Sequence, residues 1–368
     1  MKRNTIPIIS EKIMMASKLI SGFTHRHTSS TIHRTHFLTR NSAAFLSTTA
    51  SESGGGVNHN DGLVISNVNE DVGVAVLIMN RPPANSMSLE MNQAISTNLK
   101  TIEANPKIQS VILTSSKPSI FSAGLDIQEL VAPDPNRLPK FWNSMQQVCL
   151  DLYGSRLATV AALQGHAIAG GCMLAMACDY RVMYAGDCTP NNSENGQSDK
   201  KKKQHIPTIG LNETKLGIAA PPWMGQLMVN TIGFRPTEWA LALGTLFSPK
   251  DALNIGLVDA VVEGHKDDSN SNHDDVSNGI LQQLLPPSLH DQIAEPVIQN
   301  AFQEALTFAK IPPQARWASK QITRSQFLMD MEAKRDVDRE HFCGFITLDA
   351  VQKNLGAYVE ALKKRSKK

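Results

Sequence analysis

Runs of β-branched and apolar residues alternate along the chain with stretches in which apolar residues return every three or four positions. The runs predict buried strands at Val72–Met79, Ser110–Ser115 and Tyr180–Tyr184. A helix is predicted between the first two strands from the spacing of its apolar residues, Met91, Ile95, Leu99 and Ile102. Ser88 is its candidate N-cap, and Asn105-Pro106 ends it. Strands and helices that alternate in this way indicate an α/β fold with crossover connections.

The second half of the chain continues this pattern and then becomes helical. Short apolar stretches at Val160–Leu163 and Ala167–Ile168 flank Gly165, and Gly170-Gly171 opens a helix of small residues, Cys172–Ala177. After about Pro286 the apolar spacing is helical to the end. The predicted C-terminal helices are Val297–Ala309, Ala315–Met331 and Ala350–Lys364.

Two polar stretches interrupt the pattern and are predicted to be low-complexity insertions, at 187–207 and 263–279. Neither holds enough apolar surface to offset the entropy lost on ordering. The first contains the run Lys200–Lys203, which has two readings, a solvated loop tip or a phosphate-binding patch. We favour the loop tip, because runs of like charge are commonly solvated.

Charge divides the chain at about residue 50. Residues 1–50 contain seven Lys or Arg and one acidic residue, so they carry +6, whereas the rest of the chain carries −4. A basic, Ser- and Thr-rich, acid-poor start is typical of a transit peptide, here predicted to be disordered, cut between about Arg40 and Glu52 and directed to the mitochondrial matrix. A plastid address, or a disordered tail without a targeting role, is the alternative. The mildly acidic remainder argues against nucleic-acid binding, and no apolar run reaches the length of about 18 residues that a membrane span needs.

The cysteines do not indicate a metal site. Five are present, with no CxxC pair and no spacing typical of metal ligands, and they are listed here in order: Cys149, Cys172, Cys178, Cys188 and Cys343. An odd, scattered set is best interpreted as reduced structural thiols.

Three short segments carry candidate chemistry. Phe121–Asp126 and Ala169–Cys172 are small-residue turns that precede predicted helices, where the first backbone N–H groups lack intrahelical partners and favour negative charge. In the third segment, Ile209–Gly217, Glu213 lies among apolar residues, and burial there would raise its pKa and suit it to proton abstraction. Taken singly, the turns can be ordinary packing features, and Glu213 can be a surface residue or a partner of Lys215.

Taken together, these segments resemble the crotonase (enoyl-CoA hydratase/isomerase) superfamily from about Val72 to Val262. The stretches that carry the resemblance are SVILTS…FSAGLD, AGGCMLAMACDYRV, IGLNETKLGI and LALGTLFSPKDALNIGLVD. Within the superfamily, RPPANSMSLEM and the IGLNE form of the third segment are most similar to the mitochondrial Δ3,Δ2-enoyl-CoA isomerase branch.

The resemblance implies an α/β spiral of ββα units over residues 57–285 and a C-terminal helical region over 286–368. It implies acyl-CoA thioester substrates, no cofactor beyond the coenzyme A of the substrate, and assembly into homotrimers or dimers of trimers. It assigns Glu213 as the catalytic residue and the N–H groups of Leu125 and Gly170 as the oxyanion hole. The residues implied to contact substrate are Ala123, Gly124, Leu125, Asp126, Ile127, Gly170 and Asn212.

The sequence departs from the hydratases of the superfamily at Met173. Hydratases carry a glutamate at this position, three residues past the glycine of the oxyanion hole, in addition to one at the position of Glu213. A thioether cannot act as an acid or a base. A double-bond shift needs only one such group, so we expect an isomerase rather than a hydratase. The alternatives are an enoyl-CoA hydratase or another acyl-CoA-processing enzyme of the superfamily, and a non-catalytic acyl-CoA-binding protein.

Overall fold

The computed structural model describes residues 62–186, 206–263, 275–290, 293 and 295–366. The chain divides into two units, Met1–Val57 and Asn58–Lys368, and all described residues belong to the second. The predicted transit peptide and its cleavage site lie outside the described residues, as do 187–205 and 264–274 of the two predicted insertions.

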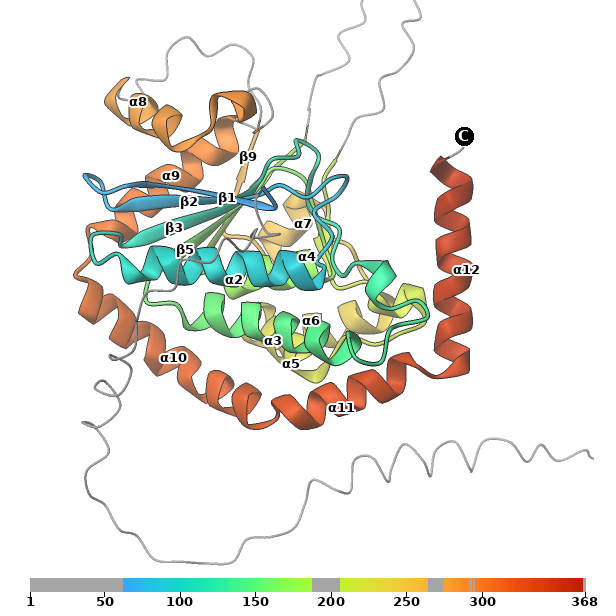
Figure 1. Ribbon diagram of the computed structural model, residues 1–368. Coiled ribbons are helices and arrows are strands. Elements are labelled where there is room, and N and C mark those ends of the chain that lie inside the picture. The colour runs from blue at the N-terminus through green and yellow to red at the C-terminus, as the bar shows by residue number, and fades with distance from the viewer. Residues whose placement is uncertain (1–61, 187–205, 264–274, 291–292, 294, 367–368) are drawn as a thin grey trace, which may run out of the picture. The chain divides into compact units, whose positions relative to one another are not determined.

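The centre of the second unit is a six-stranded sheet with the order β1-β2-β3-β5-β7-β9 (Figure 1). Its strands are β1 Val64–Asn69, β2 Val74–Met79, β3 Ser110–Ser115, β5 Ala158–Leu163, β7 Tyr180–Tyr184 and β9 Ala260–Val262. Only the β1–β2 pair is antiparallel, with Val64 opposite Met79. β2, β3 and β5 are buried at every position, which explains why they read as continuous apolar runs.

A second sheet of three short parallel strands has the order β4-β6-β8. The strands are β4 Ile120–Ser122, β6 His166–Ile168 and β8 Ile209–Gly210. Each turn of the chain therefore adds one strand to each sheet and then a helix, as in β3–β4–α3 and β5–β6–α4. This is the ββα repeat expected from the motifs, and the α/β class is confirmed.

Helices cover both faces of the large sheet, because alternate strand residues point to opposite sides. Ala75, Leu77 and Met79 of β2 face α2 Leu89–Ala104, α3 Leu138–Gly154 and α4 Gly170–Ala177. The intervening residues of β2 face the other cluster, which includes α8 Asp275–Leu284 and α9 Glu295–Ala309. Ser88 caps α2 as predicted, since its side chain accepts a hydrogen bond from Met91 N.

The C-terminal helices are α10 Pro313–Ala333, α11 Arg335–Ile346 and α12 Asp349–Ser366, with α10 and α11 running past α3 (Figure 1). The three predicted C-terminal helices are confirmed, with ends shifted by a few residues, but α11 was not predicted. One expectation was wrong in part: α8 begins at Asp275, inside the stretch predicted as the second insertion. It forms because Leu281 and Leu284 are buried against the sheet, which stabilises the polar turn before them.

The remaining elements are short and connect these layers. They are η2 Ile127–Glu129, η3 Glu213–Leu216, α5 Pro222–Ile232, α6 Phe234–Leu243, α7 Pro249–Asn254 and η4 Pro287–Leu289.

Of the five cysteines, the four in the described residues are free thiols, and Cys188 lies outside them. Among the described helices, none combines the length and the apolar character needed to cross a bilayer.

Candidate active site

The small sheet brings the three candidate segments together. Its strands are parallel, with Ser122 opposite Ala167 and Ile168 opposite Gly210. Leu125 follows the end of β4, Gly170 follows β6, and Glu213 follows β8. Because parallel strands end at the same edge of a sheet, segments separated by about 90 residues in sequence meet at one edge. Ligands of α/β folds commonly bind outside such an edge.

The backbone N–H groups of Leu125 and Gly170 lie side by side. A Cβ on Gly124 would lie 3.0 Å from Gly170 N and 2.7 Å from Ile168 O, and Gly124 has a φ of +88°. A Cβ on Gly170 would lie 3.5 Å from Leu125 N. Only glycine permits this approach of the two main chains. Among the described residues, no group accepts a hydrogen bond from either N–H, so both are available to one ligand oxygen.

The start of α4 fixes the direction of the Gly170 N–H. Ala169, the residue before the helix, has a φ of +51°, a conformation that non-glycine residues adopt only when their surroundings hold it. Two bonds hold Ala169: its N–H donates to Gly210 O, and its carbonyl accepts from Met173 N. The Gly170 N–H is the first donor of α4 and therefore has no intrahelical partner.

Glu213 is a buried carboxylate without a partner. Its residue is 3% exposed, and neither carboxylate oxygen has a hydrogen-bond partner among the described groups. Burial raises the pKa of Glu213 from 4.5 to about 7, against a smaller lowering by its own backbone N–H. The surface reading of Glu213 and its pairing with Lys215 are both wrong: it is buried, and no described ion pair includes it.

The neighbours of Glu213 are apolar or neutral. Burial raises the pKa of the Cys172 thiol, and the charge of Glu213 raises it further. Asn212 precedes η3, and its buried Oδ1 has no hydrogen-bond partner in the part of the chain that the structure describes. Met173 is fully buried in the apolar cluster that also holds Trp223. Pro222, one residue before Trp223, is exposed and opens α5.

The remaining predicted residues lie on the segment that runs from the end of β4 into the first residue of η2. Asp126 is buried, and its carboxylate is already engaged by the guanidinium of Arg81 at 2.5 Å and by Gln128 N at 3.0 Å. Substrate contacts from Ala123 to Ile127 would therefore come from the main chain and from Leu125 and Ile127, not from this carboxylate. Arg81, two residues after the end of β2, was not predicted as part of this region, because its contact with Asp126 joins residues 45 apart in sequence.

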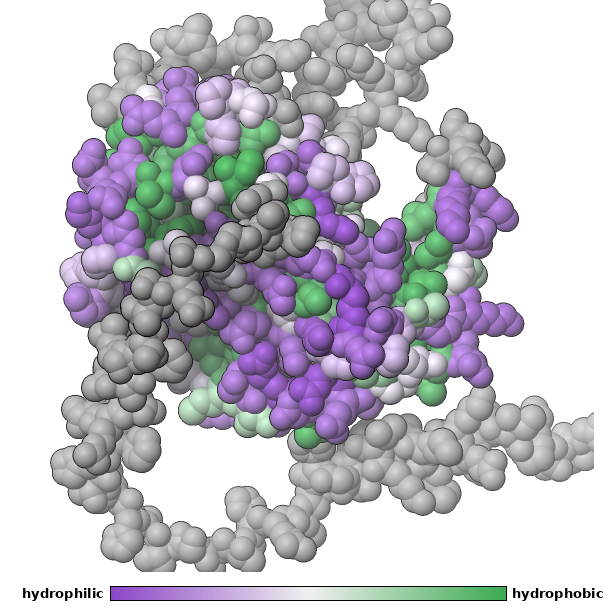
Figure 2. Space-filling model, viewed as in Figure 1, coloured by the Kyte–Doolittle hydropathy of each residue, from purple (hydrophilic) through white to green (hydrophobic). Residues whose placement is uncertain are grey.

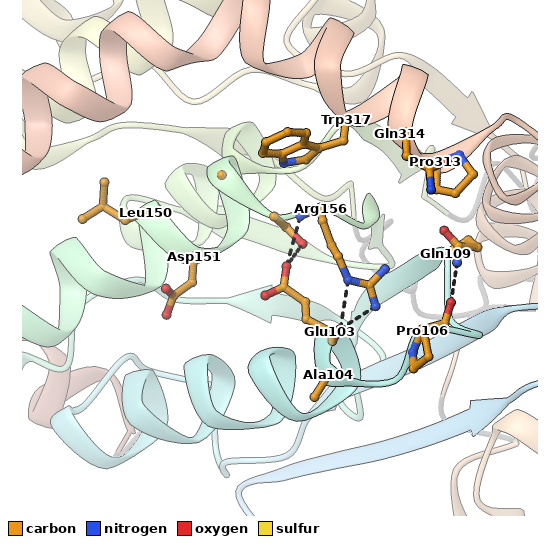
Figure 3. Close-up of a pocket in the computed structure, with 12 residues that line it drawn as sticks. Glu103, Ala104, Pro106, Gln109, Leu150, Asp151, Arg156, Pro313, Gln314 and Trp317 are labelled. Carbon is orange, nitrogen blue, oxygen red and sulfur yellow. Dashed lines mark hydrogen bonds between the residues drawn. The ribbon is translucent and has the colours of Figure 1, made fainter. Parts of the chain in front are cut away.

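A cavity of about 720 Å³ lies elsewhere, between the ends of α2 and α3 and the start of α10 (Figure 3). No predicted site residue lines it. Its Arg156 donates to the carbonyls of Glu103, Asn105 and Ile108, and Glu103 accepts from Ser155. Because Arg156 and Glu103 already make hydrogen bonds within the fold, they do not form a set of reactive side chains that converge on the cavity.

Comparison with known proteins identifies the family. The sequence profile of the enoyl-CoA hydratase/isomerase family matches residues 69–192 and 199–273, which is more than half of the chain. The chain belongs to the enoyl-CoA hydratase/isomerase family. The resemblance inferred from the motifs is thereby confirmed.

Within the hydratase/isomerase family, the chain is similar to enoyl-CoA isomerases over most of its length. Mitochondrial enoyl-CoA delta isomerase 1 of Mus musculus is 36% identical over 294 residues, 80% of this chain and 85% of the relative. The crystal structure of human mitochondrial delta3-delta2-enoyl-CoA isomerase matches with a TM-score of 0.67 and 34% identity, over 82% of this chain and 99% of that one. An enoyl-CoA hydratase from Bacillus halodurans matches with a TM-score of 0.61 at 18% identity, which shows the shared fold alone.

Proposed function

We propose that this chain is an enoyl-CoA isomerase that converts 3-enoyl-CoA to 2-trans-enoyl-CoA in the β-oxidation of unsaturated fatty acids. The observation that carries the proposal is Glu213, a lone buried carboxylate with a pKa near 7, on the sheet edge that also presents the free N–H groups of Leu125 and Gly170. The similarity to isomerases over most of the chain supports it.

The reaction begins with Glu213 as base. Its carboxylate takes a proton from the carbon between the thioester carbonyl and the double bond, and the electron pair left behind moves onto the thioester oxygen. The N–H groups of Leu125 and Gly170 donate to this oxygen, where charge develops, and the N-terminus of α4 adds its positive potential. The protonated Glu213 then delivers the same proton to the far carbon of the former double bond. Atoms and electrons balance without a cofactor.

The surroundings of Glu213 favour isomerisation over hydration. Hydration needs a second polar group to position water, and Met173 is an apolar, fully buried residue at the position where one would stand. The nearest carboxylates on the Leu125 segment are occupied, Asp126 by Arg81 and Glu129 by Arg137. Apolar walls also keep water away from the charged intermediate.

We place the enzyme in the mitochondrial matrix, delivered by residues 1–50, and give it no cofactor beyond the coenzyme A of its substrate. We expect a homotrimer or a dimer of trimers. Exposed apolar side chains on α6 and α10 support assembly, among them Phe234 at 69% and Ile322 at 83% exposure. Light scattering on the purified chain distinguishes three copies from six.

The Glu213→Gln variant tests the base. The full chain with 3-enoyl-CoA should produce the ultraviolet absorbance of the conjugated thioester, and the variant should lose about 10²–10⁴-fold in kcat, the usual contribution of a general base. Its affinity for acyl-CoA should stay within a few-fold, because the amide keeps the shape of the carboxyl group. A variant that kept most of its rate would contradict the assignment. Acyl-CoA binding without any absorbance change in the unsubstituted protein would favour a non-catalytic binding protein.

A further inference from the structure

The segment that carries Leu125 ends at a strained residue. Ala132 has a φ of +45°, in the left-handed region that alanine disfavours. Such a conformation persists only where neighbouring groups hold it. Ala132 is itself exposed, so packing does not supply that force.

The side-chain amide of Gln352, in the first turn of α12, holds this residue in place. Its Oε1 accepts from Ala132 N at 2.8 Å. Its Nε2 donates to Leu130 O at 2.9 Å and to Ile346 O at 2.6 Å. One amide thus joins three main-chain groups, two of them on the segment that follows η2 and one at the end of α11.

The other end of that segment is fixed next to Leu125. Met87 N donates to Gly124 O at 2.8 Å, and Asp126 N donates to Met87 O at 3.1 Å. Asp126 also caps η2, whose last turn leads into Leu130. Gln352 therefore closes a short, bonded path of eight residues that runs from Leu125 to Ala132.

The same turns of α12 contact the element that carries Glu213. A Cβ on Gly217, the left-handed residue that ends η3, would lie 2.5 Å from Asn354 Nδ2. Leu355 is fully buried beside this contact, and Val351 is nearly so. Figure 2 shows apolar residues along the edge of α12 that faces the body of the molecule. The start of α12 thus spans both halves of the site.

We propose that Gln352 is a positioning residue that fixes the Leu125 segment to α12 and so sets the placement of the oxyanion N–H groups relative to Glu213. The inference rests on the function proposed above. A displacement of about 1 Å at a reacting centre can cost about 10²-fold in rate. Loss of the Gln352 bonds should therefore lower kcat more than it raises KM.

Gln352→Met is the decisive variant, since it keeps the length of the side chain and removes all three bonds. We expect kcat to fall at least 10-fold with KM within about threefold, and Lys353→Ala, on the exposed neighbour in α12, to leave both unchanged. Ala132→Gly removes the strain that Gln352 holds, so Gln352→Met should cost several-fold less in that background. A kcat within threefold of the unsubstituted protein would overturn the proposal.

A second variant and a second measurement also test the proposal. If Gln352→Met does not fold, Ala132→Val loosens the same segment from an exposed position and should lower kcat alike, because a β-branched residue resists this φ. Hydrogen–deuterium exchange should rise in Gln352→Met over residues 125–132 and 213–217. Unchanged exchange in both stretches would refute the proposal that Gln352 fixes the Leu125 segment to α12. An inactive unsubstituted protein would refute the isomerase function instead, while the exchange result would still decide the role of Gln352.

Discussion

At the scale of residues, Glu213 shows what a sequence pattern can and cannot supply. Its apolar neighbours Leu211 and Ile218 predicted burial, and both are buried. Two features of Glu213 are not encoded by any local pattern: its oxygens have no hydrogen-bond partner among the described residues, and the strand before it, β8, pairs with β6. The strain at Ala169 and Ala132 was equally invisible, because alanine carries no signal for a positive φ. Backbone placement, more than residue type, assembles this site.

The raised pKa of Glu213 predicts how stability depends on pH. The folded protein holds this proton up to about pH 7, whereas the unfolded chain releases it near 4.5. Between these values the folded state binds more protons, so the free energy of unfolding falls as pH rises through the window. At about 1.4 kcal/mol per pKa unit, ionised Glu213 costs the folded protein about 3 kcal/mol above pH 7. Glu213→Gln lacks this cost.

Urea unfolding at pH 5 and pH 8 measures the effect. Relative to the unsubstituted protein, Glu213→Gln should gain about 2–3 kcal/mol more at pH 8 than at pH 5. Glu238→Gln, at a half-exposed carboxylate on α6, controls for the loss of one surface charge. Equal differences at the two pH values would show that Glu213 does not titrate near neutrality in the folded protein.

At the scale of elements, length and burial decided which parts of the fold were predictable. β2 and β3 are buried at every position and β7 at its three central positions, and all three were predicted with ends within two residues. β1 is an edge strand in which only Val64 is buried and three of its six residues, Ser66, Asn67 and Asn69, are polar, and it was missed. β4, β6 and β8 contain only two or three residues each, too few for a periodic pattern, yet they gather the candidate site. The candidate site was therefore predicted from the motifs beside these strands and not from the strands themselves.

α11 was missed because its sequence is mostly polar, and one carboxylate explains how it is nevertheless held. Asp338 Oδ2 accepts from Trp142 Nε1 and Gln146 Nε2, both at 2.7 Å, and from Trp223 Nε1 at 3.1 Å. Phe342, one turn later, stacks on Trp142 with ring centroids 3.5 Å apart. The contact joins α11 to α3 and α5.

Asp338→Ala should destabilise the protein by about 2–4 kcal/mol, since it leaves several buried donors without an acceptor. Chemical unfolding followed by tryptophan fluorescence measures this directly, because two of the donors are indoles. Asp336→Ala removes a carboxylate that is 80% exposed and pairs with Arg339 on the same helix, so it should change stability by less than about 1 kcal/mol. Similar losses in the two variants would mean that Asp338 does not anchor α11.

At the scale of the whole molecule, charge divides the chain into two parts, to which we assign different roles. Residues 1–50 carry +6, and the remainder, which contains every described element of the fold and all of the candidate site, carries −4. A basic, acid-poor start is suited to import along a negative-inside membrane potential, whereas the mildly acidic remainder has no need of it. Targeting and catalysis should therefore be separable.

Import into isolated mitochondria tests this separation. The full chain should enter and become resistant to external protease, and a chain without residues 1–50 should stay outside while keeping its isomerase activity. Charge, not length, is the proposed signal, so replacing Arg26, Arg34 and Arg40 by glutamate in the full chain should also abolish import. Replacing the same three residues by lysine keeps the positive charge and should preserve import. Import of the glutamate variant at the normal rate would show that the basic character of this segment is not what delivers the enzyme.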